Sequence, residues 1–143
     1  MPDRNKSLRL RAESAEDLTV LSAALQDAVG KIGDIRFEAK GRRLTLTLNR
    51  YRWEAGGRSR VRAALQLGSV EAVEARRLRR DAPDAVVELL ALTFEPDAEP
   101  PGGSLILSFA GGGDLKVRVE CLDAVLADVS APWPTPRTPR HGV

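Results

Sequence analysis

An early stretch of the chain has the apolar spacing of an amphipathic helix. The leucines that recur at three- and four-residue intervals are Leu18, Leu21 and Leu25. This spacing places them on one face of a helix. Ser14 precedes them, and its hydroxyl is suited to cap the first turn, while Gly30 is a residue type that often ends a helix. The pattern predicts a helix over residues 15–28, preceded by a short strand at residues 8–11.

Beyond the helix the apolar period becomes two, which is typical of β-strands. The alternation predicts seven strands, at residues 35–37, 44–48, 60–67, 70–78, 86–94, 105–109 and 115–121. Residues 70–78 also contain many helix formers, but their neighbours favour a strand. Residues 86–94 are apolar at successive positions, which predicts a strand buried on both faces. Glu88 is the exception there and requires a partner or a place near an edge. Gly111–Gly113 predicts a hairpin turn rather than a phosphate-binding loop.

These elements predict one α+β domain over residues 7–130 and a proline-rich tail, extended or disordered, over residues 131–143. Seven antiparallel strands followed by a short helix at residues 122–129 have the outline of a pleckstrin-homology-like barrel. An open antiparallel sheet packed by the first helix is the simpler alternative. The fold class we expect is therefore a mainly antiparallel β barrel or roll. It would carry one N-terminal amphipathic helix and a short C-terminal helix.

The amino-acid composition limits the catalytic and metal-binding chemistry that the chain can perform. The chain of 143 residues suits a single domain, and its one cysteine, Cys121, excludes an intrachain disulfide. Its one histidine, His141, lies near the C-terminus. Most acid–base, zinc and triad chemistry needs more histidine than this, so we expect no catalytic residues, metal site or cofactor. The chain begins without an apolar signal segment and has no membrane-spanning run, which predicts a cytoplasmic location.

The positive charge is concentrated in the middle of the chain. Residues 36–80 carry thirteen Lys/Arg and four Asp/Glu, whereas residues 81–143 carry four and ten. The basic part includes a predicted hairpin with interleaved arginines and aromatic residues. Its candidate partner-binding residues are Arg50, Tyr51, Arg52, Trp53, Arg58, Arg60 and Arg62. Alternation places both aromatic residues opposite the strand leucines, unless a bulge near Asn49 returns them to the same face.

Guanidinium groups bind carboxylate or phosphate through paired hydrogen bonds, and exposed aromatic rings supply a packing surface. The hairpin is therefore a candidate interface, and an ordinary solvated hairpin is the competing interpretation. Cys121 falls on the inward face of its strand, which indicates a structural residue rather than a nucleophile. Trp133 is expected to anchor the start of the tail against the domain.

Four segments carry a family resemblance: LRLRAESAEDLTVLSAALQDAVGKIGDI, LTLTLNRYRWE, LLALTFEPDAEPPGGSLILSF and VRVECLDAVLADVSAPW. Together they span residues 7–133 and resemble a family of small alphaproteobacterial proteins known as a domain of unknown function. The resemblance implies no activity, cofactor or catalytic residue. It does imply a gene that tends to lie near the one for histidinol dehydrogenase, which gives a context but no chemistry.

We expect a non-catalytic cytoplasmic binding or adaptor module that recognises an acidic protein partner through the basic hairpin. One alternative is nucleic-acid binding through the hairpin and the arginine run at residues 76–80, although the acidic C-terminal part disfavours it. A small metabolite-binding protein or enzyme is another alternative, supported by the implied gene neighbourhood alone. No membrane partner is expected, and the sequence leaves the oligomeric state open.

Overall fold

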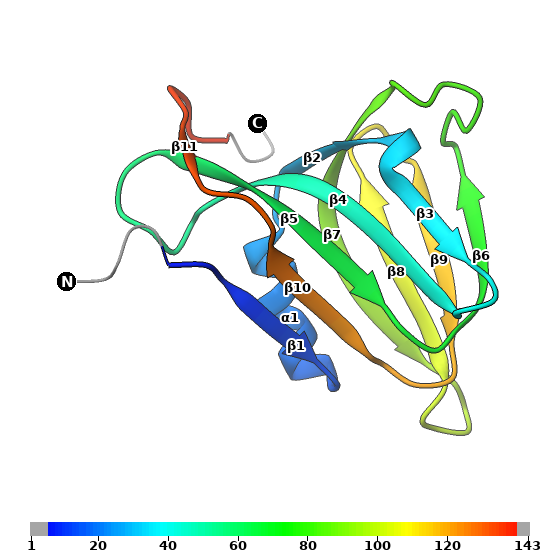
Figure 1. The fold of residues 1–143 in the computed structure, drawn as a ribbon. Coiled ribbons are helices and arrows are strands. Elements are labelled where there is room, and N and C mark those ends of the chain that lie inside the picture. Colours follow the sequence, from blue (N-terminus) through cyan, green and yellow to red (C-terminus); the bar gives the residue numbers. More distant parts are fainter. Residues whose placement is uncertain (1–5, 140–143) are drawn as a thin grey trace.

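A strongly bent antiparallel sheet organises the computed structural model, which describes residues 6–139 (Figure 1). The strands are β1 (Arg9–Ala12), β2 (Ala28–Lys31), β3 (Ile35–Glu38), β4 (Arg43–Tyr51), β5 (Ser59–Leu67), β6 (Val70–Arg76), β7 (Val86–Pro96), β8 (Gly103–Phe109), β9 (Asp114–Val119), β10 (Ala124–Asp128) and β11 (Trp133–Pro134). They pair in the order β1-β10-β5-β4-β2-β7-β8-β9-β6, with β3 on β4 and β11 on β5. The helix α1 spans Ala15–Ala24, and a short 3-10 helix spans Ile32–Asp34.

The sheet bends at β2, which joins two layers. β2 pairs with β7 along its whole length but with β4 only through Val29 and Asn49. Gly30 permits this close crossing, because a Cβ at that position would lie 2.6 Å from the Leu48 side chain. Strands β1, β10, β5, β4 and β3 form one layer, and β7, β8, β9 and β6 form the other (Figure 1).

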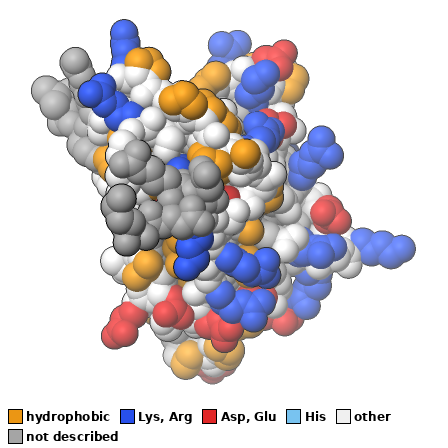
Figure 2. All heavy atoms as spheres, turned by 60° about the vertical axis from the view of Figure 1, so that its left-hand side comes forward, with side chains coloured by type: hydrophobic (Ala, Val, Ile, Leu, Met, Phe, Trp, Pro, Cys, Tyr) orange, Lys and Arg blue, Asp and Glu red, His pale blue; other side chains and the backbone are white. Residues whose placement is uncertain are grey.

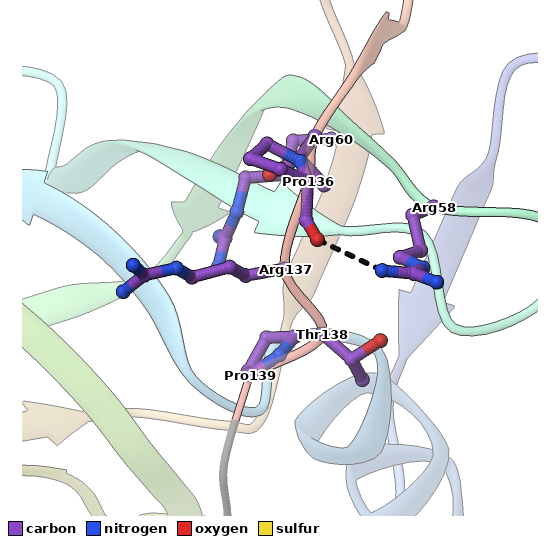
Figure 3. Close-up of a pocket in the computed structure, with 7 residues that line it drawn as sticks. Arg58, Arg60, Pro136, Arg137, Thr138 and Pro139 are labelled. Carbon is purple, nitrogen blue, oxygen red and sulfur yellow. Dashed lines mark hydrogen bonds between the residues drawn. The ribbon is translucent and has the colours of Figure 1, made fainter.

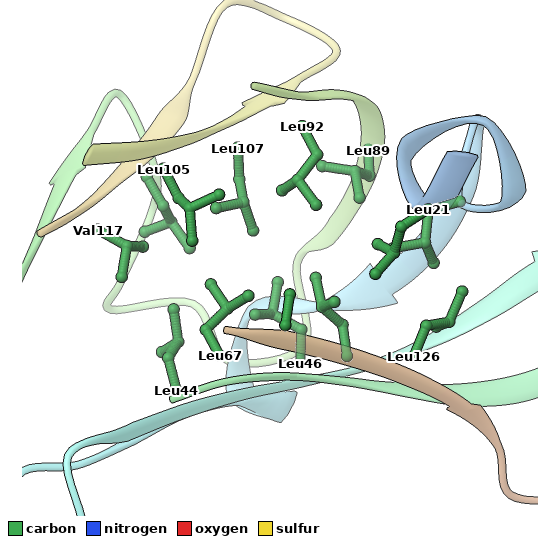
Figure 4. Packing of buried hydrophobic residues seen from close by; sticks show 14 of the residues in the cluster. Leu21, Leu44, Leu46, Leu67, Leu89, Leu92, Leu105, Leu107, Val117 and Leu126 are labelled. Carbon is green, nitrogen blue, oxygen red and sulfur yellow. The ribbon is translucent and has the colours of Figure 1, made fainter. Parts of the chain in front are cut away.

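The core fills the space between the two layers, because alternate side chains of each strand point inward. Figure 4 shows leucines of the two layers facing one another across this space. The strand residues labelled there are Leu44, Leu46, Leu67 and Leu126 on one side and Leu89, Leu92, Leu105, Leu107 and Val117 on the other, and Leu21 of the helix is labelled beside them. Full burial of one such side chain stabilises the fold by about 1.5–3 kcal/mol.

The two open sides of the bent sheet differ. Between β1 and β7 lies α1, which contacts both strands and buries Leu18 and Leu21; Leu25 is buried just beyond its end. On the other side, the edges of β3 and β6 face each other with no α-helix over them in the part of the chain that the structure describes (Figure 1). The sheet is therefore not a closed barrel.

The predicted helix begins as expected but ends early. Ser14 caps it by accepting a hydrogen bond from the Asp17 backbone N–H at 3.2 Å. The helix ends at Ala24, because Asp27 adopts a positive φ of 63° and turns the chain into β2. The prediction that it continues to residue 28 is wrong, and Gly30 lies in a strand rather than at a helix end.

The second predicted helix, at residues 122–129, is also wrong. These residues contain β10, which pairs with β1 on one edge and with β5 on the other. Backbone hydrogen bonds to two strands decide the conformation where the apolar spacing alone allowed a helix. The α+β, mainly antiparallel class is confirmed, but the closing helix of the pleckstrin-homology-like outline is absent from the described residues. The ambiguous residues 70–78 do form a strand, Val70–Arg76.

The apolar run at residues 86–94 has a different cause from the one expected. The pairing of β7 with β8 shifts between Leu89 and Ala91, so a bulge changes which positions face inward. Leu89 and Leu92 are both buried, while Val86 and Leu90 are exposed. Before the bulge the inward-facing positions are odd-numbered, as Leu89 is, and after it they are even-numbered, as Leu92 is. The apolar run reflects this change, and the prediction of a strand buried on both faces is wrong.

The start of the tail is ordered against the domain. Trp133 and Pro134 form β11 and pair with Arg60 and Ser59 of β5, although the Trp133 side chain is partly exposed. Residues 140–143, which include His141, lie outside the described residues. Within residues 6–139, no helix has the length and apolar character needed to cross a membrane.

Candidate partner-binding surface

The β4–β5 hairpin contains all the candidate residues of the basic cluster. Its strands pair without a register shift from Leu44–Leu67 to Tyr51–Arg60, so there is no bulge at Asn49. The alternation therefore continues, and Arg50 takes the inward position that follows the three strand leucines. Tyr51 points to the outer face, as expected for an unbulged strand.

Arg50 is completely buried in an ion-pair network. It donates two hydrogen bonds of 2.9 Å to the two carboxylate oxygens of Asp128, and two more, of 2.9 and 2.8 Å, to Glu54. Asp128 also accepts a hydrogen bond from the Leu8 backbone N–H at 2.8 Å. The network thereby connects the hairpin to β10 and to the start of β1.

The electrostatics of this network follow from burial and pairing together. Burial alone would lower the pKa of the Arg50 guanidinium, but its hydrogen bonds to Glu54 and Asp128 raise that pKa above its usual value. For Glu54, burial acts to raise the pKa, and the hydrogen bond from Arg50 brings it below its ordinary range. Arg50 and Glu54 therefore stay charged, and Arg50 is a structural cation in this conformation.

Arg52 is likewise turned toward the protein. It is buried, and its Nη1 donates to the Ser59 hydroxyl at 3.1 Å, while its backbone N–H donates to the Ser59 carbonyl at 3.0 Å. Two of the five candidate arginines thus face internal partners. The remaining three, Arg58, Arg60 and Arg62, keep surface positions.

The two aromatic residues form one cluster on the outer face. The ring centroids of Tyr51 and Trp53 lie 4.6 Å apart, and the Arg60 guanidinium lies 6.0 Å from the Tyr51 ring centroid. The Trp53 indole N–H donates to the Gln26 carbonyl at 3.2 Å. The Tyr51 hydroxyl lies 3.3 Å from that of Thr138, so the C-terminal segment covers this tyrosine.

An open hollow of about 920 Å³ lies between the C-terminal segment and the hairpin. It is lined by Arg58, Arg60, Thr135, Pro136, Arg137, Thr138 and Pro139 (Figure 3). Three of these residues are cationic, and among the described residues that line the hollow there is no carboxylate. Figure 2 brings this end of the molecule forward and shows Lys and Arg side chains exposed across the face.

Backbone carbonyls rather than carboxylates hold two of the arginines in the hollow. Arg58 donates to the Pro136 carbonyl at 2.9 Å, and Arg60 donates to the Asn49 carbonyl at 3.2 Å. A neutral acceptor orients a guanidinium without cancelling its charge. Arg62 differs, because its Nη2 lies 3.5 Å from the Asp34 carboxylate.

Sequence reasoning missed Arg137 and also Asp27, which is the partner that Glu88 was expected to require. Arg137 stands 77 positions after Arg60, and only the path of the tail brings them together. Glu88 forms a hydrogen bond with the buried Asp27. Burial raises the pKa of Glu88 first, the bond with Asp27 and its negative charge raise it further, and Arg60 opposes them. The signal for this carboxyl pair in the sequence was Glu88, a single glutamate in an apolar strand.

Other candidate chemistry is sparse in the described part of the chain. Residues 6–139 bring no three His, Cys, Asp or Glu side chains together in a group suited to a metal ion. Cys121 lies beyond the end of β9 and is half-buried rather than core-facing, with its sulfur 3.7 Å from the Ser69 hydroxyl. Gly111 and Gly112 adopt positive φ angles in the β8–β9 hairpin, which confirms the predicted turn.

The fold and this surface define an α+β protein with a bent antiparallel sheet and a basic hairpin strapped by its own C-terminal segment. The chain belongs to the family described as protein of unknown function (DUF2948), whose model matches residues 8–141. This confirms the resemblance to a domain of unknown function. No curated protein and no solved structure matches the chain.

Proposed function

We propose that the protein is a non-catalytic binding module that recognises an acidic protein partner at the hollow between the hairpin and the C-terminal segment. The observation that carries the proposal is the charge of the lining: Arg58, Arg60 and Arg137 contribute guanidinium groups without a carboxylate among the described lining residues. Guanidinium–carboxylate pairs combine charge with paired hydrogen bonds, and arginine is enriched at protein interfaces.

The arrangement also reduces the entropy that is lost when a partner binds there. Arg58 and Arg60 each use one donor on a backbone carbonyl, and a guanidinium has five donors in total. The remaining donors are held in place before a ligand arrives, which lowers the entropy lost on binding. The Tyr51 ring lies beside Arg60, with its centroid 6.0 Å from the guanidinium.

The test compares two charge-reversed variants of the full chain. Arg58→Glu with Arg60→Glu changes the hollow, and Arg9→Glu with Arg11→Glu makes the same change of net charge on exposed positions of β1. Binding is measured with a fluorescent glutamate-rich peptide and with a single-stranded oligonucleotide across a salt series. Both variants are first compared with the parent chain by thermal unfolding.

We expect the hollow variant to lose peptide binding, and the β1 variant to retain most of it. Equal losses in both variants would show that net charge alone is responsible and would overturn the proposal. Preference for the oligonucleotide, with a steep loss of affinity as salt rises, would instead establish nucleic-acid binding.

A further inference from the structure

A second surface lies on the side of the molecule away from α1, between β3 and β6 (Figure 1). It is a groove of about 360 Å³. β3 pairs with β4 and β6 pairs with β9, and within residues 6–139 neither strand has a partner on its other edge. Such edges present unpaired backbone N–H and C=O groups, which are able to accept another strand.

The groove is apolar because inward-facing positions of both edge strands line it. These residues are Ile35 and Phe37 of β3 and Val73 and Ala75 of β6. Phe37 pairs with Leu44, and Ala75 pairs with Leu115, so the lining continues directly into the core. Phe37 nevertheless remains 42% exposed, which is a large apolar surface left uncovered at this position.

Both ends of the groove are fixed by backbone hydrogen bonds. At one end the Val70 N–H donates to the Arg42 carbonyl at 2.9 Å. At the other, the Gly33 N–H donates to the Pro83 carbonyl at 2.8 Å. The two layers are therefore held together at both ends, and the opening between them has a defined length.

The charge that lines the groove is positive, and unpaired cations outnumber unpaired carboxylates around it. Arg80 is the one charged residue among the described groove-lining residues. Five cations on β3 or in the loops that follow β3 and β6 form no ion pair with another residue of the described chain: Arg36, Lys40, Arg77, Arg79 and Arg80. The carboxylates of β6 and its following loop that likewise form none are fewer: Glu71, Glu74 and Asp81. Neighbouring arginines differ, since Arg42 and Arg76 pair with Glu120 and Asp114.

We propose that this groove binds an extended segment of a partner protein that carries apolar residues in alternation with acidic ones. The segment adds a strand to β3 or β6 and so uses their free backbone groups. Its apolar side chains cover Phe37 and Val73, and its carboxylates face Arg80 and the cations beside it. Period-two alternation is required because successive side chains of a strand point to opposite faces. This site is separate from the hairpin hollow and does not depend on the function proposed there.

The experiment is selection of a phage-displayed library of random linear peptides on the immobilised full chain, followed by affinity measurement of the enriched peptides. We expect enriched peptides to alternate apolar and acidic residues. A proline placed at their centre should abolish binding, because it removes a backbone donor needed for strand pairing. Phe37→Ser and Arg80→Glu should each weaken binding about tenfold or more.

The matched control is Leu90→Ser, which changes an apolar residue of similar exposure, 45%, on β7 outside the groove. It should leave the affinity unchanged. Absence of enrichment, enriched peptides without acidic residues, or equal effects of Phe37→Ser and Leu90→Ser would overturn the proposal. Self-association of the chain that Phe37→Ser abolishes would overturn it in favour of a second copy as the occupant. Loss of peptide binding in the Arg58/Arg60 variant would place the peptides at the hairpin instead.

Discussion

At the β1–β7 side of the bent sheet, α1 covers the core with leucines that are almost inaccessible to solvent. At the β3–β6 side, the corresponding apolar side chains end in a groove whose one charged lining residue, among those described, is Arg80. One sheet therefore has one side closed by its own chain and one side left open. The buried leucines of the closed side contribute stability, and the open side is the surface that we propose for recognition.

The closed side also includes the buried arginine network. Arg50 and Asp128 connect β4 to β10, and Asp128 holds the backbone of Leu8 at the start of β1. The acid pair of Asp27 and Glu88 lies where the chain leaves α1 and enters β2. Substitutions on the two sides should consequently differ in what they change: the free energy of unfolding on one side, and affinity on the other.

The largest effect is expected at Arg50. Arg50→Ala leaves the carboxylate of Asp128 buried, with a side-chain exposure of 1%, and without its cation. Removing one member of a buried pair costs about 3–5 kcal/mol of unfolding free energy. Denaturant unfolding should show this loss, while Arg58→Ala, in the same hairpin, should change the unfolding free energy by no more than about 1 kcal/mol. Similar values for the two variants would contradict the structural role of Arg50.

The next largest effect is expected in α1. Leu21→Ala removes a fully buried side chain and should lower the unfolding free energy by about 2–5 kcal/mol. Val20→Ala, one position away and 58% exposed, should change it by about 0.5 kcal/mol or less. A small effect of Leu21→Ala in denaturant unfolding would mean that the helix does not close this side.

A smaller, pH-dependent effect is expected at Glu88. Its pKa is raised in the folded state, so the folded state retains a proton that the unfolded state loses as the pH passes its ordinary value of 4.5. The folded state therefore loses stability from this group as pH rises through that window. Glu88→Gln keeps the hydrogen-bonding group without the titration. The unfolding free energy of the variant relative to the parent chain, measured with urea, should rise between pH 4 and pH 7. If the two chains show the same dependence of unfolding free energy on pH, Glu88 does not contribute in this way.

The smallest effect on stability is expected on the open side. Phe37→Ser should change the unfolding free energy by no more than about 1 kcal/mol, since much of the ring is already in water. The same variant should nevertheless lose binding to peptides selected for the groove. A loss as large as that of Leu21→Ala would show that β3 is part of the stabilising core and would remove the contrast between the two sides.

Local signals predicted much of this fold. The Ser14 cap and the period-two alternation located the start of α1 and most of the strands. The end of the helix was not predictable in this way, because the apolar stripe continues past the turn at Asp27. Residues 122–129 have helical apolar spacing as well, and their strand conformation depends on pairing with β1 and β5, which are distant in the sequence.

The candidate surface was predictable only in outline. The sequence placed the arginines on one hairpin, but an inward-facing arginine is tolerated only where carboxylates meet it. Asp128, which meets Arg50, is 78 residues away in the chain. The path of the tail, which brings Arg137 to the hollow, and the bulge in β7 are likewise tertiary features that no local pattern reports. The groove arises from the bend at β2, which brings β3 and β6 to the same side.

Amide hydrogen exchange, with and without a peptide enriched on the wild-type chain, tests the recognition role of the open side most directly. Strand addition protects backbone N–H groups at the edge that receives the peptide. We predict that amides of β3 or β6 exchange more slowly when the peptide is bound, while those of α1, β1 and the β4–β5 hairpin are unchanged. Protection confined to the hairpin or to α1, or no change in β3 and β6, would contradict the account.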